Sequence, residues 1–133
     1  MIQHLRIARP VSDIARSTTM YCVGLGLQVL SRFENHDGFD GVTLGRSDAQ
    51  YHFEFTRCRL HVVAPTPSRE DLIVLYVPDQ DDWTQACRNM VVAGFSRVTS
   101  PNPYWEVRGR AFEDADGYRT VLERAAWRVQ GTV

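Results

Sequence analysis

The sequence of 133 residues is poor in cysteine, and the three cysteines that it has are scattered. Cys22, Cys58 and Cys87 form no close pair, and an odd, dispersed set is a poor disulfide framework and a poor zinc site. Free cysteine usually behaves as a small apolar residue of the protein interior. We therefore expect free thiols and a cytoplasmic location.

An excess of charge of one sign is also lacking, because 15 basic residues stand against 16 acidic ones. Without a broad basic field there is little to hold nucleic acid or an anionic membrane surface. No apolar run reaches membrane-spanning length, and the N-terminus does not have the regions of a signal peptide. Gly24-Leu25-Gly26 follows a helical pattern instead of opening one, so it is not a phosphate loop. The sequence predicts neither a nucleic-acid partner nor a membrane partner.

Regular alternation of strand and helix patterns is what the sequence does contain. Residues 5–11 alternate as in a half-buried strand, and Ser12-Asp13 is a candidate helix N-cap. The helical pattern that follows is expected to stop at Gly24 and Gly26. Three more strands are predicted over 27–34, 39–44 and 51–58, with a hairpin turn over residues 35–38 between the first two.

The same order begins again after a proline-containing segment. Strands are predicted over 72–77, 95–99, 110–113 and 118–124, with a helix from Asp79 to Gly94 and an irregular segment over 101–105. Matching positions lie 66 to 68 residues apart, which indicates an internal duplication. We predict one α+β domain, residues 1–133, whose two tandem βαβββ modules form a curved mixed sheet, or half-barrels, with a central cavity. Module one covers about residues 1–64, a linker about 65–70, and module two about 71–127.

Motifs near both ends of this pattern resemble those of a known superfamily. Residues 11–17, followed by Tyr21 and by Leu25-Gly26-Leu27, look like the opening of a vicinal-oxygen-chelate module. Residues 112–118 resemble its closing signature, Phe-x-Asp-Pro-Asp-Gly, with Ala115 in place of the proline. By this resemblance, which spans nearly the whole chain, the protein is similar to the glyoxalase/bleomycin-resistance/extradiol-dioxygenase superfamily. Metal-dependent enzymes and metal-free drug-sequestering proteins share that fold, so the fold does not choose the function.

In the metal-dependent members, the resemblance implies four metal ligands, one on the first and one on the fourth strand of each module. The matching positions here are Arg6, Glu54, Leu72 and Val121. Only Glu54 can bind a divalent metal, and the cationic Arg6 would repel one. Because a metal site needs three or four ligands, we favour the absence of a metal cofactor.

A displaced metal site is the alternative interpretation. A shift of one pleat would offer His4, His52, Glu54 and Glu123, which share strand faces with three of the inherited positions and could bind zinc, iron, nickel or manganese. Strand-end residues such as His4 and Glu123 are, however, usually solvated and without special function.

A ligand site follows from Arg6 and Glu54 in a different way. The guanidinium group of Arg6 can pair with Glu54, or with a carboxylate or phosphate of a ligand, and a purely structural ion pair is equally compatible with the sequence. Arg119 is also expected to face the cavity, which favours an anionic or zwitterionic ligand. Tyr76 and Trp105, with Tyr104, are expected as aromatic walls, although a hydrophobic lid would explain the last two equally well. The predicted ligand contacts are Arg6, His52, Glu54, Tyr76, Trp105 and Arg119, whereas Trp83 is predicted to belong to the core.

Two functions therefore stay open at this point. The favoured one is a metal-independent protein that binds a small anionic or zwitterionic molecule. The alternative is a lyase, isomerase or dioxygenase whose divalent metal acts as a Lewis acid on a vicinal oxygen pair. The resemblance also implies a homodimer, because small members commonly complete their cavities across two chains.

Overall fold

The computed structural model describes residues 1–131, and the order of its elements is that of a tandem repeat. The chain divides into two compact units, Met1–Thr66 and Pro67–Val133, which are called module one and module two below. Each module is described by itself. That the two modules build a single domain around a central cavity stays a prediction.

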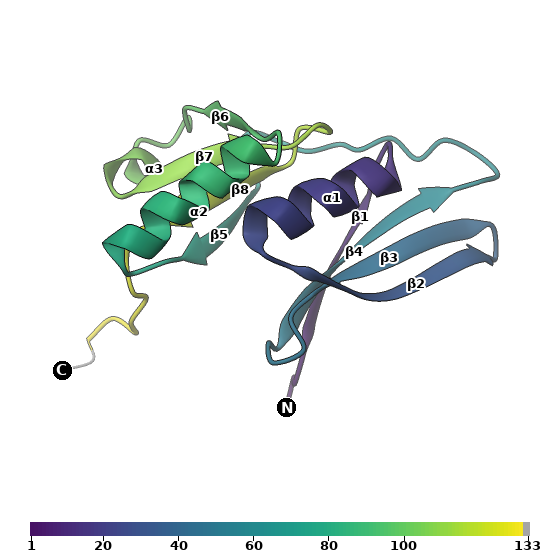
Figure 1. The fold of residues 1–133 in the computed structure, drawn as a ribbon, viewed down its shortest axis with the longest axis horizontal. Coiled ribbons are helices and arrows are strands. Elements are labelled where there is room, and N and C mark those ends of the chain that lie inside the picture. The colour runs from purple at the N-terminus through teal and green to yellow at the C-terminus, as the bar shows by residue number, and fades with distance from the viewer. Residues whose placement is uncertain (132–133) are drawn as a thin grey trace. The chain divides into compact units, whose positions relative to one another are not determined.

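Module one is a four-stranded mixed sheet with one helix on one face (Figure 1). Its strands follow the order β1-β4-β3-β2, in which β1 is parallel to β4 and the other neighbours are antiparallel. The helix begins where the Asp13 carboxylate accepts a hydrogen bond from the Arg16 amide at 3.0 Å, and it ends at Gly26, whose φ of 68° suits a left-handed cap. The elements are β1 Leu5–Pro10, α1 Ile14–Leu25, β2 Gln28–His36, β3 Phe39–Gly45 and β4 Tyr51–Cys58.

Module two repeats this topology with the strand order β5-β8-β7-β6, and β5 is parallel to β8. The Asp79 carboxylate caps its main helix by accepting from the Asp82 amide at 2.9 Å. Two acidic residues in the first turn, Asp81 and Asp82, add a favourable interaction with the helix dipole. The elements are β5 Leu72–Tyr76, α2 Gln80–Val92, β6 Ser96–Val98, α3 Tyr104–Val107, β7 Gly109–Glu113 and β8 Arg119–Glu123.

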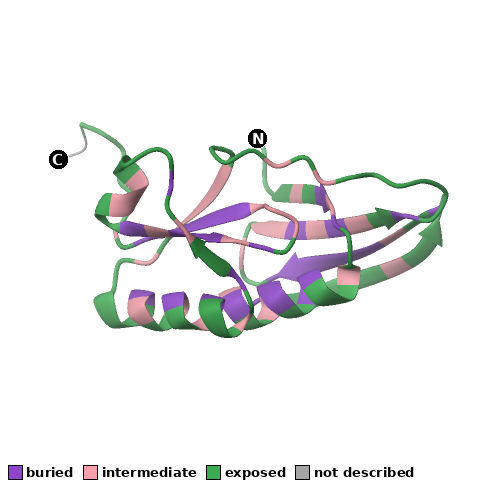
Figure 2. Ribbon diagram, turned by 90° about the horizontal axis from the view of Figure 1, so that it is seen from above, coloured by how far each residue is buried: buried purple, intermediate pink, exposed green. Residues whose placement is uncertain are grey.

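A buried tyrosine attaches α1 to its sheet. The ring of Tyr21 meets that of Phe55 edge-on at 4.8 Å between centroids, and it lies 5.6 Å from that of Phe53. Phe53 and Phe55 therefore point toward α1, and their neighbours on β4 point to the opposite face of the sheet. Figure 2 shows buried positions on α1 as bands between exposed ones, which is the pattern of a helix packed along one side.

A buried tryptophan has the same role in module two. The indole Nε1 of Trp83 donates a hydrogen bond to the Leu122 carbonyl at 2.9 Å, and the guanidinium groups of Arg110 and Arg124 lie over its ring. The prediction that Trp83 belongs to the core is confirmed, because its exposed fraction is 9%. The α2 side of this sheet is thus identified, and β8 residues 119, 121 and 123 point to the opposite face.

The closing signature of the superfamily shapes a turn here. One oxygen of the Asp114 carboxylate accepts from the amides of Asp116 at 2.9 Å and of Tyr118 at 3.0 Å, which closes the connection between β7 and β8. Gly117 has a φ of 94°, a conformation that glycine adopts without strain. The motif is therefore a device of the fold.

Several local predictions are corrected. Gly24 does not stop α1 but lies buried inside its last turn, because the left-handed conformation occurs at Gly26. β2 continues through residues 35 and 36, so the turn is restricted to Asp37-Gly38. The segment predicted as irregular leads into α3, whose start is favoured by Pro103 with a φ of −65°.

The predicted α+β class with tandem βαβββ modules is confirmed. Both sheets are mixed, and neither of them closes into a barrel within residues 1–131. Cys22, Cys58 and Cys87 are free, as expected. In the same stretch of chain, no helix has the length and apolar character that crossing a membrane requires.

Candidate functional site

Four polar side chains of module one form a hydrogen-bonded group on the sheet face opposite α1, here called the histidine–arginine cluster: His4, Arg6, His52 and Glu54. The register of the parallel pair β1 and β4 places Arg6 beside His52. Arg6 donates from Nη1 to Glu54 Oε2 at 2.8 Å and from Nε to His52 Nε2 at 2.8 Å. His52 Nδ1 and His4 Nε2 lie 2.6 Å apart. The ion pair expected between Arg6 and Glu54 is therefore present, and it is one link of a longer chain.

This chain of contacts determines where the His52 proton lies. Because Nε2 of His52 accepts from Arg6, its proton is on Nδ1, from which it donates to His4. Burial lowers the pKa of His52, and the neighbouring charges of Arg6 and His4 lower it further against the opposing effect of Glu54. His52 is thus a neutral imidazole held in one tautomer.

The residues at the inherited metal-ligand positions do not fit a metal. Val121 is fully buried and Leu72 half-buried, both are aliphatic, and Arg6 brings a positive charge. Within residues 1–131, no three His, Cys, Asp or Glu side chains are arranged to hold a metal ion. The displaced set His4, His52, Glu54 and Glu123 accordingly does not form a ligand group there.

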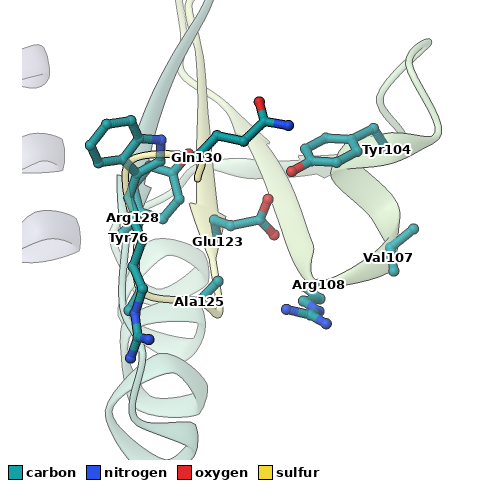
Figure 3. Close-up of a pocket in the computed structure, with 10 residues that line it drawn as sticks. Tyr76, Tyr104, Val107, Arg108, Glu123, Ala125, Arg128 and Gln130 are labelled. Atoms are coloured by element: carbon teal, nitrogen blue, oxygen red, sulfur yellow. The ribbon is translucent and has the colours of Figure 1, made fainter. Parts of the chain in front are cut away.

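Module two contains a cavity of about 840 Å³, here called the Glu123 pocket (Figure 3). Glu123 comes from β8 and extends into the space bounded by Tyr104, Arg108 and Gln130. Tyr76 comes from β5, where it is the register neighbour of Glu123. The segment that follows β8 completes the lining with Ala125, Ala126, Trp127, Arg128 and Gln130.

A glycine opposite Glu123 leaves room for the carboxylate. β7 pairs Gly109 with Glu123, and a β-carbon at Gly109 would lie 3.1 Å from Glu123 Oε1 and 2.6 Å from the Trp105 carbonyl oxygen. Both oxygens are hydrogen-bond acceptors, so this side of the pocket floor is rich in acceptors. Any side chain at position 109 would occupy the space between them.

The Glu123 carboxylate is the most unusual group of the pocket. The residue is only 4% exposed, and Oε1 is buried without a hydrogen-bond partner. Burial raises the pKa of Glu123, and the nearby positive charge of Arg108 opposes this effect. A buried acceptor without a partner costs about 1–3 kcal/mol, which a ligand that donates a hydrogen bond would offset.

The predicted ligand contacts are distributed over different places. Tyr76 lines the Glu123 pocket, whereas Arg6, His52 and Glu54 belong to the histidine–arginine cluster of module one. Trp105 is half-buried and packs edge-on against Tyr104 at 4.9 Å, and it does not line the cavity. Arg119 is buried and donates from Nε to Glu113 at 2.9 Å, so its charge is already paired. The structure thus does not place these six residues in a single site.

Several pocket residues were not predicted from the sequence. Arg108 was missed because it follows a short helix that had been predicted as irregular structure. Trp127, Arg128 and Gln130 lie beyond the last strand and were taken as a simple tail. An exposed tryptophan among polar residues, 66% exposed here, was the available signal for a ligand contact.

Two family models match this chain. They describe a YycE-like N-terminal domain over residues 5–56 and a YycE-like C-terminal domain over residues 70–124. A YycE protein of Bacillus subtilis (strain 168) is 38% identical over 118 residues, which is 89% of this chain and 85% of that protein.

Solved structures resemble the fold. A crystal structure of a YycE protein from Bacillus subtilis, of unknown function and described as a candidate glyoxalase/fosfomycin resistance protein, superposes with a TM-score of 0.88 at 34% identity, covering 98% of this chain and 95% of that one. The fosfomycin resistance protein FosX from Mesorhizobium loti gives a TM-score of 0.70 at 16% identity, covering 95% and 94%. The second likeness concerns the fold alone.

Proposed function

Because this chain belongs to the YycE-like family, within the vicinal-oxygen-chelate superfamily, we propose that it is a metal-independent binding protein for a small zwitterionic or anionic molecule. The observation that carries the proposal is the Glu123 pocket. Its wall has three aromatic side chains, Tyr76, Tyr104 and Trp127, and charged groups of both signs border it. A concave, largely apolar site with a few convergent polar groups is the usual form of a small-molecule site.

The charges of the pocket favour a zwitterion over a simple anion. The deepest ionisable group is a carboxylate, Glu123, whereas Arg108 and Arg128 are exposed. The arginines of the original prediction do not contribute here, since Arg119 pairs with Glu113 and Arg6 pairs with Glu54. A molecule with separate positive and negative ends would complement this arrangement.

Metal independence is supported by the chemistry of the side chains. Glu54 alone retains metal-binding capacity among the four inherited positions, and its carboxylate is already engaged by Arg6 at 2.8 Å. A binding protein needs no Lewis acid, because the aromatic wall and the charges suffice to hold a ligand.

The proposal is tested with four compounds that share a phenethyl skeleton: phenylalanine, phenylpropionate, phenethylamine and phenylethanol. We expect ligand-observed NMR to detect binding of phenylalanine or phenylpropionate, with no change when EDTA is added. Trp127→Ala should weaken this binding at least tenfold, whereas Val91→Ala, an exposed position on α2 outside the pocket, should not change it. Stoichiometric zinc, iron, nickel or manganese in untagged protein, with binding lost in EDTA, would instead support the metal-dependent lyase, isomerase or dioxygenase.

We also propose a homodimer in the cytoplasm. The superfamily resemblance is the basis for the dimer, and three free cysteines support a reducing compartment. Sedimentation equilibrium of the untagged protein should give twice the chain mass of 15.2 kDa. A chain mass that stays at the monomer value at high concentration would contradict the dimer.

A further inference from the structure

The Glu123 carboxylate suggests which chemical group of a ligand the pocket recognises. Its residue is 96% buried, since 4% is exposed, and Oε1 has no partner among residues 1–131. Figure 3 shows the side chain directed into the cavity and away from its own strand. A buried carboxylate in such a position is stable only when a donor or a cation reaches it.

The groups around Glu123 do not supply that donor. Tyr76 of β5 and Tyr104 of α3 line the same cavity, but neither donates a hydrogen bond to the carboxylate in the described structure. Arg108 is near enough for its charge to act on Glu123, yet it forms no ion pair with it. The carboxylate is therefore available to a molecule that enters the cavity.

A second acceptor lies beside the first. The Trp105 carbonyl oxygen and Glu123 Oε1 flank the same side of Gly109, at 2.6 Å and 3.1 Å from the point where a β-carbon would be. A protonated primary amine has three N–H donors, so it can serve more than one acceptor at once. A hydroxyl group offers a single donor and no charge.

We propose that the Glu123 pocket recognises a protonated primary amine, which forms an ion pair with Glu123, while the apolar body of the same ligand packs on Tyr76 and Tyr104. The inference rests on the proposed function and narrows its ligand to amino-acid-like zwitterions and related amines. The negative end of such a zwitterion lies toward Arg108 and Arg128, on the exposed side of the cavity. Aromatic faces beside the cation add a favourable cation–π interaction.

The test compares the same four phenethyl compounds on matched variants. In the wild-type protein, phenylalanine and phenethylamine should bind at least tenfold more tightly than phenylpropionate and phenylethanol. Glu123→Gln should abolish this preference and leave the affinity for phenylethanol unchanged. Glu113→Gln removes a carboxylate of the same module that is already paired with Arg119, so it should retain the preference.

A measurement on the wild-type protein makes the test independent of any variant. The carboxyl carbon of Glu123, followed by ¹³C NMR, should shift on addition of phenethylamine and should not shift with phenylethanol. An amine preference that survives in Glu123→Gln, or tighter binding of phenylpropionate than of phenethylamine, would overturn the inference and leave the proposed binding function standing. Absence of binding by all four compounds would overturn both.

Discussion

The same register position is filled in module one and hollow in module two. β3 and β4 pair Gly41 with Thr56, and β7 and β8 pair Gly109 with Glu123. A β-carbon at Gly41 would lie 2.2 Å from the Phe33 ring, which covers that position. At Gly109 no aromatic ring covers the sheet, and the Glu123 carboxylate points into a cavity instead.

The length of the edge strand explains this difference. β2 spans Gln28–His36 and carries Phe33 across the sheet, whereas β6 stops at Val98, its pairing partner being Ala111. Beyond Val98 the chain leaves the sheet and forms α3, which brings Tyr104 to the rim of the pocket. A duplicated topology can thus keep its core while a shorter edge strand opens a place for a ligand.

The largest expected effect tests whether the two cores are equivalent. Tyr21→Ala and Trp83→Ala each remove the aromatic side chain that attaches a helix to its sheet, so each should lower the free energy of unfolding by about 3–5 kcal/mol. Urea denaturation followed by circular dichroism measures both. Val91→Ala, on the exposed side of α2, should change stability by less than about 0.5 kcal/mol. A loss below about 1 kcal/mol for one aromatic only would show that the modules are anchored differently.

The second prediction concerns the two glycines. Gly109→Ala should cost about 2 kcal/mol in stability, because its β-carbon meets the Trp105 carbonyl, which moves only together with α3. It should also weaken phenethylamine binding at least tenfold, because it fills the space next to Glu123. Gly41→Ala displaces the end of a side chain, Phe33, so it should cost less and leave ligand affinity unchanged. Equal affinities in both variants would place the ligand outside the Glu123 pocket.

Much of the fold could be predicted from the sequence because its signals are local. Asp13 and Asp79 before apolar helical patterns predicted both helix starts, and Tyr51–Cys58 was predicted with its observed bounds. The pocket could not be predicted, because it depends on how far β6 extends and on where the chain goes after β8. Tyr76 and Glu123 were named from strand alternation alone. The partners Arg108 and Gln130 lie in segments without periodicity, where the sequence indicates no direction.

The third prediction uses two carboxylates of opposite standing. Glu54→Gln should lower stability at pH 7 by about 0.5 kcal/mol, because Glu54 pairs with the half-exposed Arg6. Glu123→Gln should raise it by about 1 kcal/mol, because a buried charge without a partner is removed. The raised pKa of Glu123 means that the folded state binds the proton more tightly than the unfolded state does. The destabilisation by Glu123 therefore appears as the pH rises through the ordinary glutamate range and is absent well below it.

Unfolding curves of both glutamine variants at pH 3, 5 and 7 measure these changes. The gain from Glu123→Gln should be largest at pH 7 and negligible at pH 3. A loss of stability in Glu123→Gln at pH 7 would mean that the carboxylate has a stabilising partner in the folded protein.

The smallest expected effect belongs to His52 of the histidine–arginine cluster. Its pKa is lowered, first by burial and then by Arg6 and His4, so the unfolded state binds the proton more readily than the folded state. The stability that neutral His52 provides is complete above the ordinary histidine pKa, about 6.5, and is lost as the pH falls through that value toward the lower folded-state pKa. His52→Asn should therefore flatten the decline in stability between pH 7.5 and 5.5, whereas replacing the exposed His61 in the same way should not. Because the contacts with Arg6 and His4 put the proton on Nδ1, ¹⁵N NMR of the imidazole gives a second measurement, and a protonated Nε2 at pH 7.5 would contradict the hydrogen-bond chain from which the shift follows.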